Sequence, residues 1–296
     1  MRLRPFALSE PGTVGEAVAA LAAGDGEARL VAGGTALVPM IRLGLVAPDR
    51  LVSLHRVAGL RGVSTVHGHL ELGAMTTYGH VERHPDVRRG WPLLALAAGR
   101  VASPAVRSMG TVGGNLAYAE AASDVSPALL CLEAGVRVAG PRGERTVPIG
   151  ELFRGFYETA LEPGEIVTAV RVPALPAGAR SGYVKFCSRS AEDKPLVGVA
   201  AVLRMADGGT GCAEARIGLG GAAPTPIRAP AAESALRGAE LTDATIARAA
   251  EAAAAEAEPL SDVMGSADYR RRMIRVWVRR LLADLRAGRA VVGSPS

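Results

Sequence analysis

A glycine-rich segment near the middle of the chain, residues 103–124, constrains the fold more than any other. It places Gly110, Gly113 and Gly114 within five residues. Glycines this close together let the backbone turn sharply and approach a ligand, because no Cβ stands in the way. Successive free N–H groups in such a turn form a concave site that suits a phosphate. An earlier tract, residues 31–35 (VAGGT), has the same character, and two such loops in one chain predict a dinucleotide ligand.

The composition is that of a folded protein. The chain has 296 residues, 49% hydrophobic and 21% charged, and is long enough for two domains. Aromatic residues make up only 4%, so stacking on nucleic-acid bases is not indicated. The net charge of +5 includes many arginines near the C-terminus, which we interpret as solvated helix faces. No apolar signal core or membrane-spanning stretch is present, and we expect a cytoplasmic protein without a membrane span.

Motifs for other chemistry are missing from the sequence. The cysteines are too few and too scattered for an iron–sulfur cluster or a disulfide framework: Cys131, Cys187 and Cys212. Two histidine pairs lack the thiol, carboxylate or HExxH glutamate of a metal site, and we expect no metal there: His67 with His69, and His80 with His84. GxSxG, P-loop and GxGxxG motifs are also missing. The chemistry is therefore expected to come from a bound cofactor.

The hydrophobic pattern predicts an α+β fold. Thr13 and Glu16 form a capping box at the start of a helix. Helices are expected at residues 14–23, 92–102 and 126–133, and strands at residues 30–32, 49–55, 59–73 (two), 136–139, 145–148 and 165–173. A segment rich in Pro and Gly, residues 173–178, is the predicted linker. Beyond it we expect strands at residues 182–189, 196–205 and 212–219 in one antiparallel sheet, then helices at residues 242–258 and 268–285.

Both glycine loops carry a family resemblance. The stretch TVGGNLAYAEAASDVSPALL resembles the second flavin loop of the FAD-binding medium subunits of molybdenum hydroxylases, the carbon monoxide dehydrogenase and xanthine dehydrogenase group. The stretch VAGGTALVPMIRLG resembles their first loop. Further similar stretches are ELFRGFYETALEPGEIVTAVRVP, YVKFCSRSAEDKPLVGVAA and ARIGLGGAAPTPIRA, in the order of the family. The resemblance implies an FAD-binding domain of the vanillyl-alcohol-oxidase/PCMH type at residues 1–175, with subdomains at about 1–57 and 58–175, and a C-terminal flavoprotein domain at residues 176–296.

The resemblance also implies a set of cofactor-binding residues. The first loop would wrap one side of the FAD pyrophosphate with Ala32, Gly33, Gly34, Thr35 and Ala36. The second loop would wrap the other side with Thr111, Val112, Gly113, Gly114 and Asn115. Lining positions are Ala102, Gly110 and Ile166. Asp124 would accept hydrogen bonds from the adenosine ribose, and Lys185 would lie close to the isoalloxazine, where its charge raises the flavin potential.

Two departures from the family pattern bear on binding. Ala36 stands where the group often has Ser or Asp, so a side-chain contact there is in doubt while the backbone contribution remains. The histidine that tethers flavin covalently in some related oxidases is missing from the first loop. The resemblance therefore implies non-covalent FAD.

The function implied by the resemblance is electron transfer within a larger enzyme. Electrons would leave the substrate at molybdopterin on a large subunit, cross [2Fe–2S] clusters on a small subunit, and reach an external acceptor through FAD on this chain. The complex would be a dimer of heterotrimers, with its substrate chosen by another subunit. Two alternatives remain open, a self-contained flavin oxidase acting on a small alcohol and a structural subunit that has lost flavin.

Overall fold

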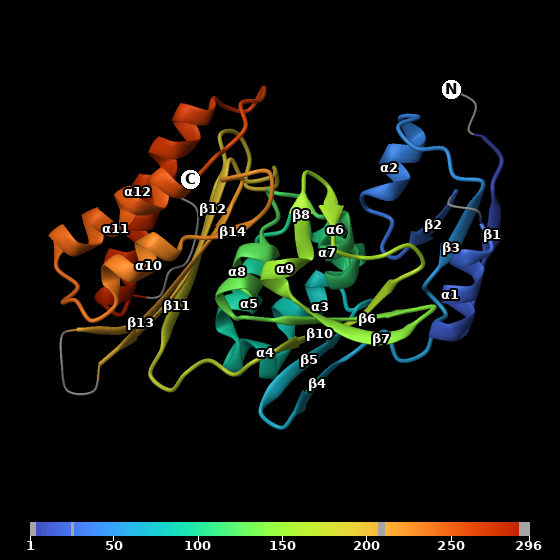
Figure 1. Cartoon of the computed structure of the whole chain (residues 1–296), viewed down its shortest axis with the longest axis horizontal. Helices are drawn as coiled ribbons and strands as arrows, with labels where there is room; N and C mark the ends of the chain where they lie inside the picture. Colours follow the sequence, from blue (N-terminus) through green and yellow to red (C-terminus); the bar gives the residue numbers. More distant parts are fainter. Residues whose placement is uncertain (1–3, 25–26, 207–210, 290–296) are drawn as a thin grey trace.

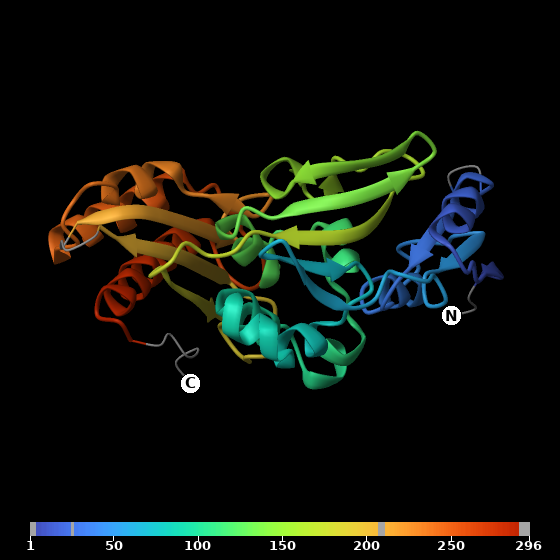
Figure 2. The same ribbon diagram turned by 90° about the horizontal axis from the view of Figure 1, so that it is seen from below.

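The computed structural model describes residues 4–24, 27–206 and 211–289. Figure 1 shows three parts in a row, which are an N-terminal sheet, a central sheet with helices, and a C-terminal sheet with helices on its outer face. Figure 2, seen from below, shows the same three parts with the N-terminal and C-terminal sheets at opposite ends. Strands and helices are thus mixed throughout, as the α+β prediction requires.

The N-terminal sheet is parallel and small. Its strands are β1 (Ala7–Ser9), β3 (Arg50–Ser53) and β2 (Ala28–Val31), in that order across the sheet. Helix α1 (Val14–Ala22) connects β1 to β2. At its start the Glu16 N–H donates to the Thr13 hydroxyl at 3.2 Å, and the Gly12 N–H donates to the Glu16 carboxylate at 2.7 Å. The capping interaction predicted from the sequence is confirmed, with Gly12 in place of Thr13 as the second donor.

The central sheet is antiparallel and has the order β4-β5-β10-β6-β7. Its strands are Val63–Val66, His69–Gly73, Ile166–Val172, Gly135–Gly140 and Gly143–Pro148. Turns at residues 67–68 and 141–142 connect β4 to β5 and β6 to β7 as hairpins. The helices that accompany this sheet are α3 (Tyr78–Arg83), α4 (Pro85–Gly90), α5 (Pro92–Gly99) and α8 (Val125–Cys131), and their apolar side chains form one core with the strands.

The segment expected to be one long loop contains two short helices. They are α6 (Pro104–Met109) and α7 (Val112–Tyr118), and the helix predicted at residues 92–102 ends at Gly99. The hydroxyls of Ser103 and Thr111 cap these helices by accepting from the backbone N–H three residues later. Helix α7 could not be predicted from the sequence, because it contains Gly113 and Gly114 and glycine disfavours helix in general. The sequence analysis also missed α2 (Leu37–Arg42), α9 (Ile149–Leu152) and the hairpin of β8 (Phe153–Gly155) and β9 (Glu158–Thr159).

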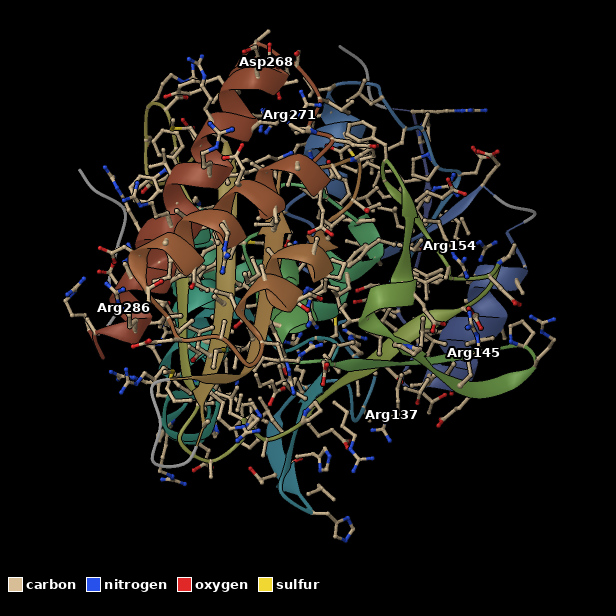
Figure 3. The ribbon with its side chains drawn as sticks, turned by 60° about the vertical axis from the view of Figure 1, so that its left-hand side comes forward. Arg137, Arg145, Arg154, Asp268, Arg271 and Arg286 are labelled. Carbon is tan, nitrogen blue, oxygen red and sulfur yellow. The ribbon has the colours of Figure 1, made fainter. Side chains whose placement is uncertain are left out.

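The C-terminal part is an antiparallel sheet covered by helices. The sheet has the order β11 (Arg180–Phe186), β12 (Val197–Met205), β13 (Cys212–Gly220) and β14 (Ile227–Arg228). The helices are α10 (Pro230–Leu236), α11 (Asp243–Glu256) and α12 (Ala267–Arg286). The apolar stripe of α12 is buried against the sheet, while Arg271 and Arg286 project at the surface (Figure 3). In the described part of the chain, no helix has the length and hydropathy needed to cross a bilayer.

The central and C-terminal parts share a hydrophobic core. Tyr183, Ala200 and Val202 of the C-terminal sheet belong to the same buried cluster as Leu129 of α8. Helix α8 lies directly on β13, because a Cβ at Gly218 would stand 2.4 Å from the carbonyl oxygen of Pro127. Packing of this density fixes the position of the C-terminal sheet relative to the central part. Residues on β11 are therefore held at a defined place beside the glycine loops.

Candidate functional site: a pocket between two glycine loops

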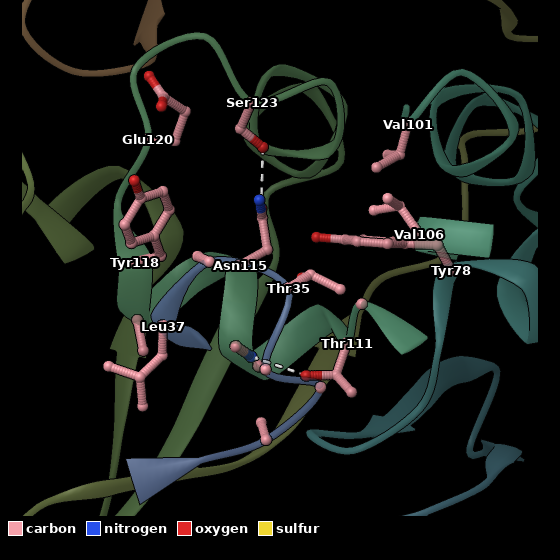
Figure 4. A pocket seen from close by; sticks show the side chains of 18 of the residues that line it. Thr35, Leu37, Tyr78, Val101, Val106, Thr111, Asn115, Tyr118, Glu120 and Ser123 are labelled. Carbon is pink, nitrogen blue, oxygen red and sulfur yellow. Dashed lines mark hydrogen bonds between the residues drawn. The ribbon is translucent and has the colours of Figure 1, made fainter. Parts of the chain in front are cut away.

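A pocket of about 450 Å³ opens between the first glycine loop (residues 32–36), the second glycine loop (residues 110–115) and β11. Figure 4 shows Thr35 of the first loop facing Thr111 and Asn115 of the second across this pocket. The structure brings almost all the predicted site residues to its lining: Ala32, Gly33, Gly34, Thr35, Ala36, Ala102, Gly110, Thr111, Gly113, Gly114, Asn115, Asp124, Ile166 and Lys185. Val112 is the exception, because its side chain is fully buried in the central core.

The first glycine loop offers unpaired backbone donors. Within the described residues, the N–H groups of Gly33, Gly34, Thr35 and Ala36 donate no backbone hydrogen bond. Gly34 has φ of +70°, a conformation that glycine adopts without the penalty of a side chain. A run of N–H groups around such a turn makes an anion site. The side chain of Ala36 adds nothing to it, so the contribution of this position is its backbone.

The second glycine loop uses its donors within the protein. The N–H groups of Val112 and Gly113 donate to the carbonyl oxygens of Thr76 and Ala74 at 3.0 and 2.8 Å. Those of Gly114 and Asn115 donate to the hydroxyl and carbonyl oxygens of Thr111 at 3.1 and 3.0 Å. The N–H groups of residues 112–115 are therefore not free, in contrast to the expectation from the glycine pattern, and the role of this loop in holding a pyrophosphate stays a prediction.

Close packing explains the glycines of both loops better than positive φ angles do. A Cβ at Gly33 would stand 2.0 Å from the carbonyl oxygen of Met109, and one at Gly113 would stand 2.9 Å from that of Ala74. Gly113 and Gly114 lie in α7 without positive φ. These glycines let the first loop contact the second, and let the second contact the end of the central sheet. The pocket wall is thus assembled by backbone contacts between segments far apart in sequence.

A buried ion pair closes one side of the pocket. The Lys185 ammonium lies 3.2 Å from Asp124 Oδ2 and donates to the carbonyl oxygen of Arg100 at 2.7 Å. The Tyr183 hydroxyl donates to Asp124 Oδ1 at 2.7 Å. Burial raises the pKa of Asp124 from 3.8 to about 6, against the opposing effects of Lys185 and Tyr183. Asp124 is thereby committed to two protein partners before any ligand binds.

The contact between Asp124 and Lys185 bears on the roles predicted for both residues. The adenosine ribose and the isoalloxazine lie on opposite sides of the pyrophosphate, yet the two side chains assigned to them touch each other. The roles of both residues toward FAD stay predictions. The charge of Lys185 is paired with that of Asp124, which reduces the effect of the ammonium on its surroundings.

A second polar cluster lies at the edge of the pocket, and the sequence analysis missed it. The carboxylate of Glu120 accepts from the Tyr157 hydroxyl at 2.8 Å and pairs with the ammonium of Lys194. The rings of Tyr118 and Tyr157 contact each other at a tilt of 47°, with centroids 4.9 Å apart. Glu120 and Lys194 both line the pocket, and they join the loop after α7 to the segment between β11 and β12. The only trace of this cluster in the sequence is the charged segment at residues 190–195, which contains Lys194.

The histidine pairs lie away from the pocket lining. His67 and His69 lie at the turn between β4 and β5. His80 lies on α3 and His84 directly follows it, with ring centroids 5.4 Å apart. In the described residues, no group of three or more His, Cys, Asp or Glu side chains is placed to hold a metal ion.

Comparisons with known proteins match the chain along almost its whole length. A family model described as FAD binding domain in molybdopterin dehydrogenase matches residues 4–175, and one described as CO dehydrogenase flavoprotein C-terminal domain matches residues 182–285. The carbon monoxide dehydrogenase medium chain of Hydrogenophaga pseudoflava is 37% identical over 277 residues, which is 94% of this chain and 96% of the relative.

Two further likenesses extend this result. Subunit alpha of the 6-hydroxypseudooxynicotine dehydrogenase complex from Paenarthrobacter nicotinovorans is 35% identical over 271 residues, which is 92% of this chain and 91% of the relative. Among solved structures, carbon monoxide dehydrogenase from Hydrogenophaga pseudoflava lacking the Mo-pyranopterin moiety matches with a TM-score of 0.94 and 38% identity, covering 98% of this chain and 100% of that one. These likenesses confirm the predicted fold class.

Proposed function

Because the chain belongs to the family of FAD-binding medium subunits of molybdenum hydroxylases, as its relatives show, we propose that it holds FAD between its two glycine loops and relays electrons. The observation that carries this proposal is the pocket itself, which both glycine loops line and where the N–H groups of the first loop donate no backbone hydrogen bond to the described residues. When bound, FAD supplies the capacity to accept electrons from one redox centre and deliver them to another.

The residues of the pocket fit such a cofactor. The N–H groups of Gly33 to Ala36 would hold the pyrophosphate, and the tight contact of Gly33 with Met109 brings the two loops to a spacing that encloses it. Asn115 is oriented by the Ser123 hydroxyl, which donates to its side-chain oxygen at 2.8 Å, and this leaves the amide N–H groups of Asn115 for the ligand. The buried pair of Asp124 and Lys185 forms a polar wall at one end of the pocket.

The partners follow from the kind of complex to which the relatives belong. Those relatives are named as a medium chain and as a subunit of a dehydrogenase complex. We propose a small subunit carrying [2Fe–2S] clusters, a large subunit carrying molybdopterin, a dimer of heterotrimers, and an external electron acceptor. We further propose that the FAD domain covers residues 1–175 and the C-terminal domain residues 176–296, with the subdomain boundary near residue 57, because the linker at 173–178 separates β10 from β11.

Purification of the complex tests this function. The affinity-tagged chain, expressed with the genes encoded beside it, should co-purify with subunits that contain iron and molybdenum, while flavin follows the tagged chain. Flavin in the complex should be bleached by the oxidisable substrate, and flavin in the isolated chain should not be. Bleaching in the isolated chain would favour a self-contained oxidase, and a complex free of flavin would favour a structural subunit. Either result would overturn the proposed relay.

A further inference from the structure

A buried tyrosine in the pocket has a hydroxyl without a protein partner. Tyr78 begins α3, is only 4% exposed, and lines the pocket. Within the described part of the chain, its hydroxyl makes no hydrogen bond. A buried phenol usually finds a partner, because an unpaired hydroxyl in an apolar surrounding is destabilising.

The position of this ring is fixed by the second glycine loop. The Tyr78 N–H donates to the carbonyl oxygen of Gly110 at 3.0 Å. A Cβ at Gly110 would stand 3.0 Å from Cε2 of the ring, so the aromatic ring packs directly on this glycine. Figure 4 shows the hydroxyl directed across the pocket, toward the side formed by Asn115 and Ser123. The side chain cannot turn away from the pocket without losing these contacts.

Comparison with the other unpaired buried atoms separates Tyr78 from ordinary packing defects. Four more buried side-chain atoms lack a partner among the described residues, and they belong to His84, Ser126, Arg270 and Trp277. None of these four residues lines the pocket. The Tyr78 hydroxyl is the one that faces the space where a ligand would lie.

The surroundings keep this hydroxyl protonated and available. Burial, and to a lesser extent the charge of Asp124, raise the pKa of Tyr78 far above its ordinary value. Asp124 already accepts from Tyr183 and Lys185. The phenol is therefore a hydrogen-bond donor at physiological pH.

We propose that the hydroxyl of Tyr78 donates a hydrogen bond to the bound FAD and so anchors the cofactor, a role that neither the family resemblance nor the comparisons assign to this residue. The inference rests on the proposed function, because it takes FAD to be the ligand of this pocket. A phenylalanine at position 78 would keep the ring packed on Gly110 and remove only the donor.

The test compares Tyr78→Phe with Tyr269→Phe in the full chain, stripped of flavin and titrated with FAD. Tyr269 lies on α12 outside the pocket lining, so its substitution controls for loss of a tyrosine hydroxyl elsewhere. Tyr78→Phe should weaken FAD binding about fivefold to tenfold, the usual effect of one hydrogen bond, and Tyr269→Phe should leave it unchanged. Titration with ADP and with FMN then identifies the half of the cofactor that receives the bond, because only that half loses affinity.

The unfolding temperature of the flavin-free variants completes the test. Tyr78→Phe should unfold at the same or a higher temperature than the wild type, since it removes an unpaired buried hydroxyl. A lower unfolding temperature would mean that the hydroxyl has a partner inside the folded chain, and this would overturn the proposal. Unchanged FAD affinity in Tyr78→Phe would also overturn it. A wild-type chain that binds no FAD would instead refute the proposed function.

Discussion

The ammonium of Lys185 lies 3.2 Å from the carboxylate of Asp124, and both side chains are almost fully buried. The pair joins β11 of the C-terminal sheet to the residue that precedes α8 in the central part. The pair therefore connects the central and C-terminal parts and sets the charge at one end of the pocket. Burial has raised the pKa of Asp124 to about 6 despite the ammonium beside it.

Removing the ammonium should destabilise the chain in a way that depends on pH. In Lys185→Met the buried carboxylate of Asp124 is left unpaired, and the free energy of unfolding should fall by about 3–5 kcal/mol at about pH 8. At about pH 5 the loss should be smaller, because Asp124 can then take up a proton and avoid a buried charge. Denaturant unfolding at both pH values measures the difference.

The sign of the pH effect follows from the raised pKa. Between the ordinary value of 3.8 and about 6, the folded chain binds the Asp124 proton more tightly than the unfolded chain does. The contribution of Asp124 to stability is therefore present at low pH and is lost as the pH rises through about 6. Loss of Lys185 raises this pKa further, so the penalty grows with pH. The double variant with Asp124→Asn should recover part of the loss, and equal destabilisation of Lys185→Met at both pH values would contradict this account.

In Gly34→Ala, the loss of FAD binding free energy should exceed the loss of unfolding free energy. At φ of +70° an alanine is strained by about 1–2 kcal/mol, and its Cβ would stand 3.2 Å from Cγ2 of Val38. The strain should change the turn that presents the free N–H groups. Gly178→Ala is the matched control, because Gly178 has φ of +73° with nothing within 4 Å of its Cβ position. Both variants should lose similar unfolding free energy, and equal loss of FAD affinity in both would contradict the role of the first loop.

Thr111→Val should loosen the second loop. Its hydroxyl accepts from the Gly114 N–H at 3.1 Å, and loss of such a cap costs about 1 kcal/mol. Because α7 forms a wall of the pocket, FAD affinity should fall as well. Thr13→Val removes a similar cap from α1, where the bond from the Glu16 N–H is 3.2 Å, and should reduce stability without affecting FAD. Titration and thermal unfolding of both variants distinguish the two effects.

Glu120→Gln should speed the release of FAD. The carboxylate holds Tyr157 and Lys194 together at the edge of the pocket, so its neutral amide should loosen the segment at residues 190–195. We expect the rate of FAD dissociation to rise several-fold, because charge-assisted hydrogen bonds are about twice as strong as neutral ones. Overall stability should change little. Glu133→Gln, which affects ion pairs with Arg216 and Arg228 away from the pocket, is the control. A rate of FAD release that is the same in wild type and both variants would contradict the role of Glu120 in slowing that release.

The sequence predicted the parts of this structure that depend on local pattern. Helix α1 and strands β11, β12 and β13 of the C-terminal sheet follow from caps, Gly and Pro punctuation, and alternation. The sequence could not reveal which loop keeps free N–H groups, because that depends on contacts of Val112 with Thr76 and of Gly113 with Ala74. Short helix α7 was hidden by the very glycines that its packing requires.

The pocket, too, could be predicted from the sequence only in part. The resemblance located its lining residues, but the pairing of Asp124 with Lys185 joins side chains 61 positions apart. The contact of Glu120 with Lys194 spans 74 positions. Such pairs follow from how the C-terminal sheet packs on α8, and no local pattern encodes that arrangement. The unpaired hydroxyl of Tyr78 becomes visible only when every neighbour is in place.

The most direct test of the central claim is the flavin content of the isolated chain after reconstitution with FAD and removal of excess cofactor. We predict one FAD per chain, which acid precipitation should release into the supernatant as intact FAD, because the pocket binds it without a covalent tether. A chain that retains no flavin, or flavin that stays with the precipitated protein, would contradict the account.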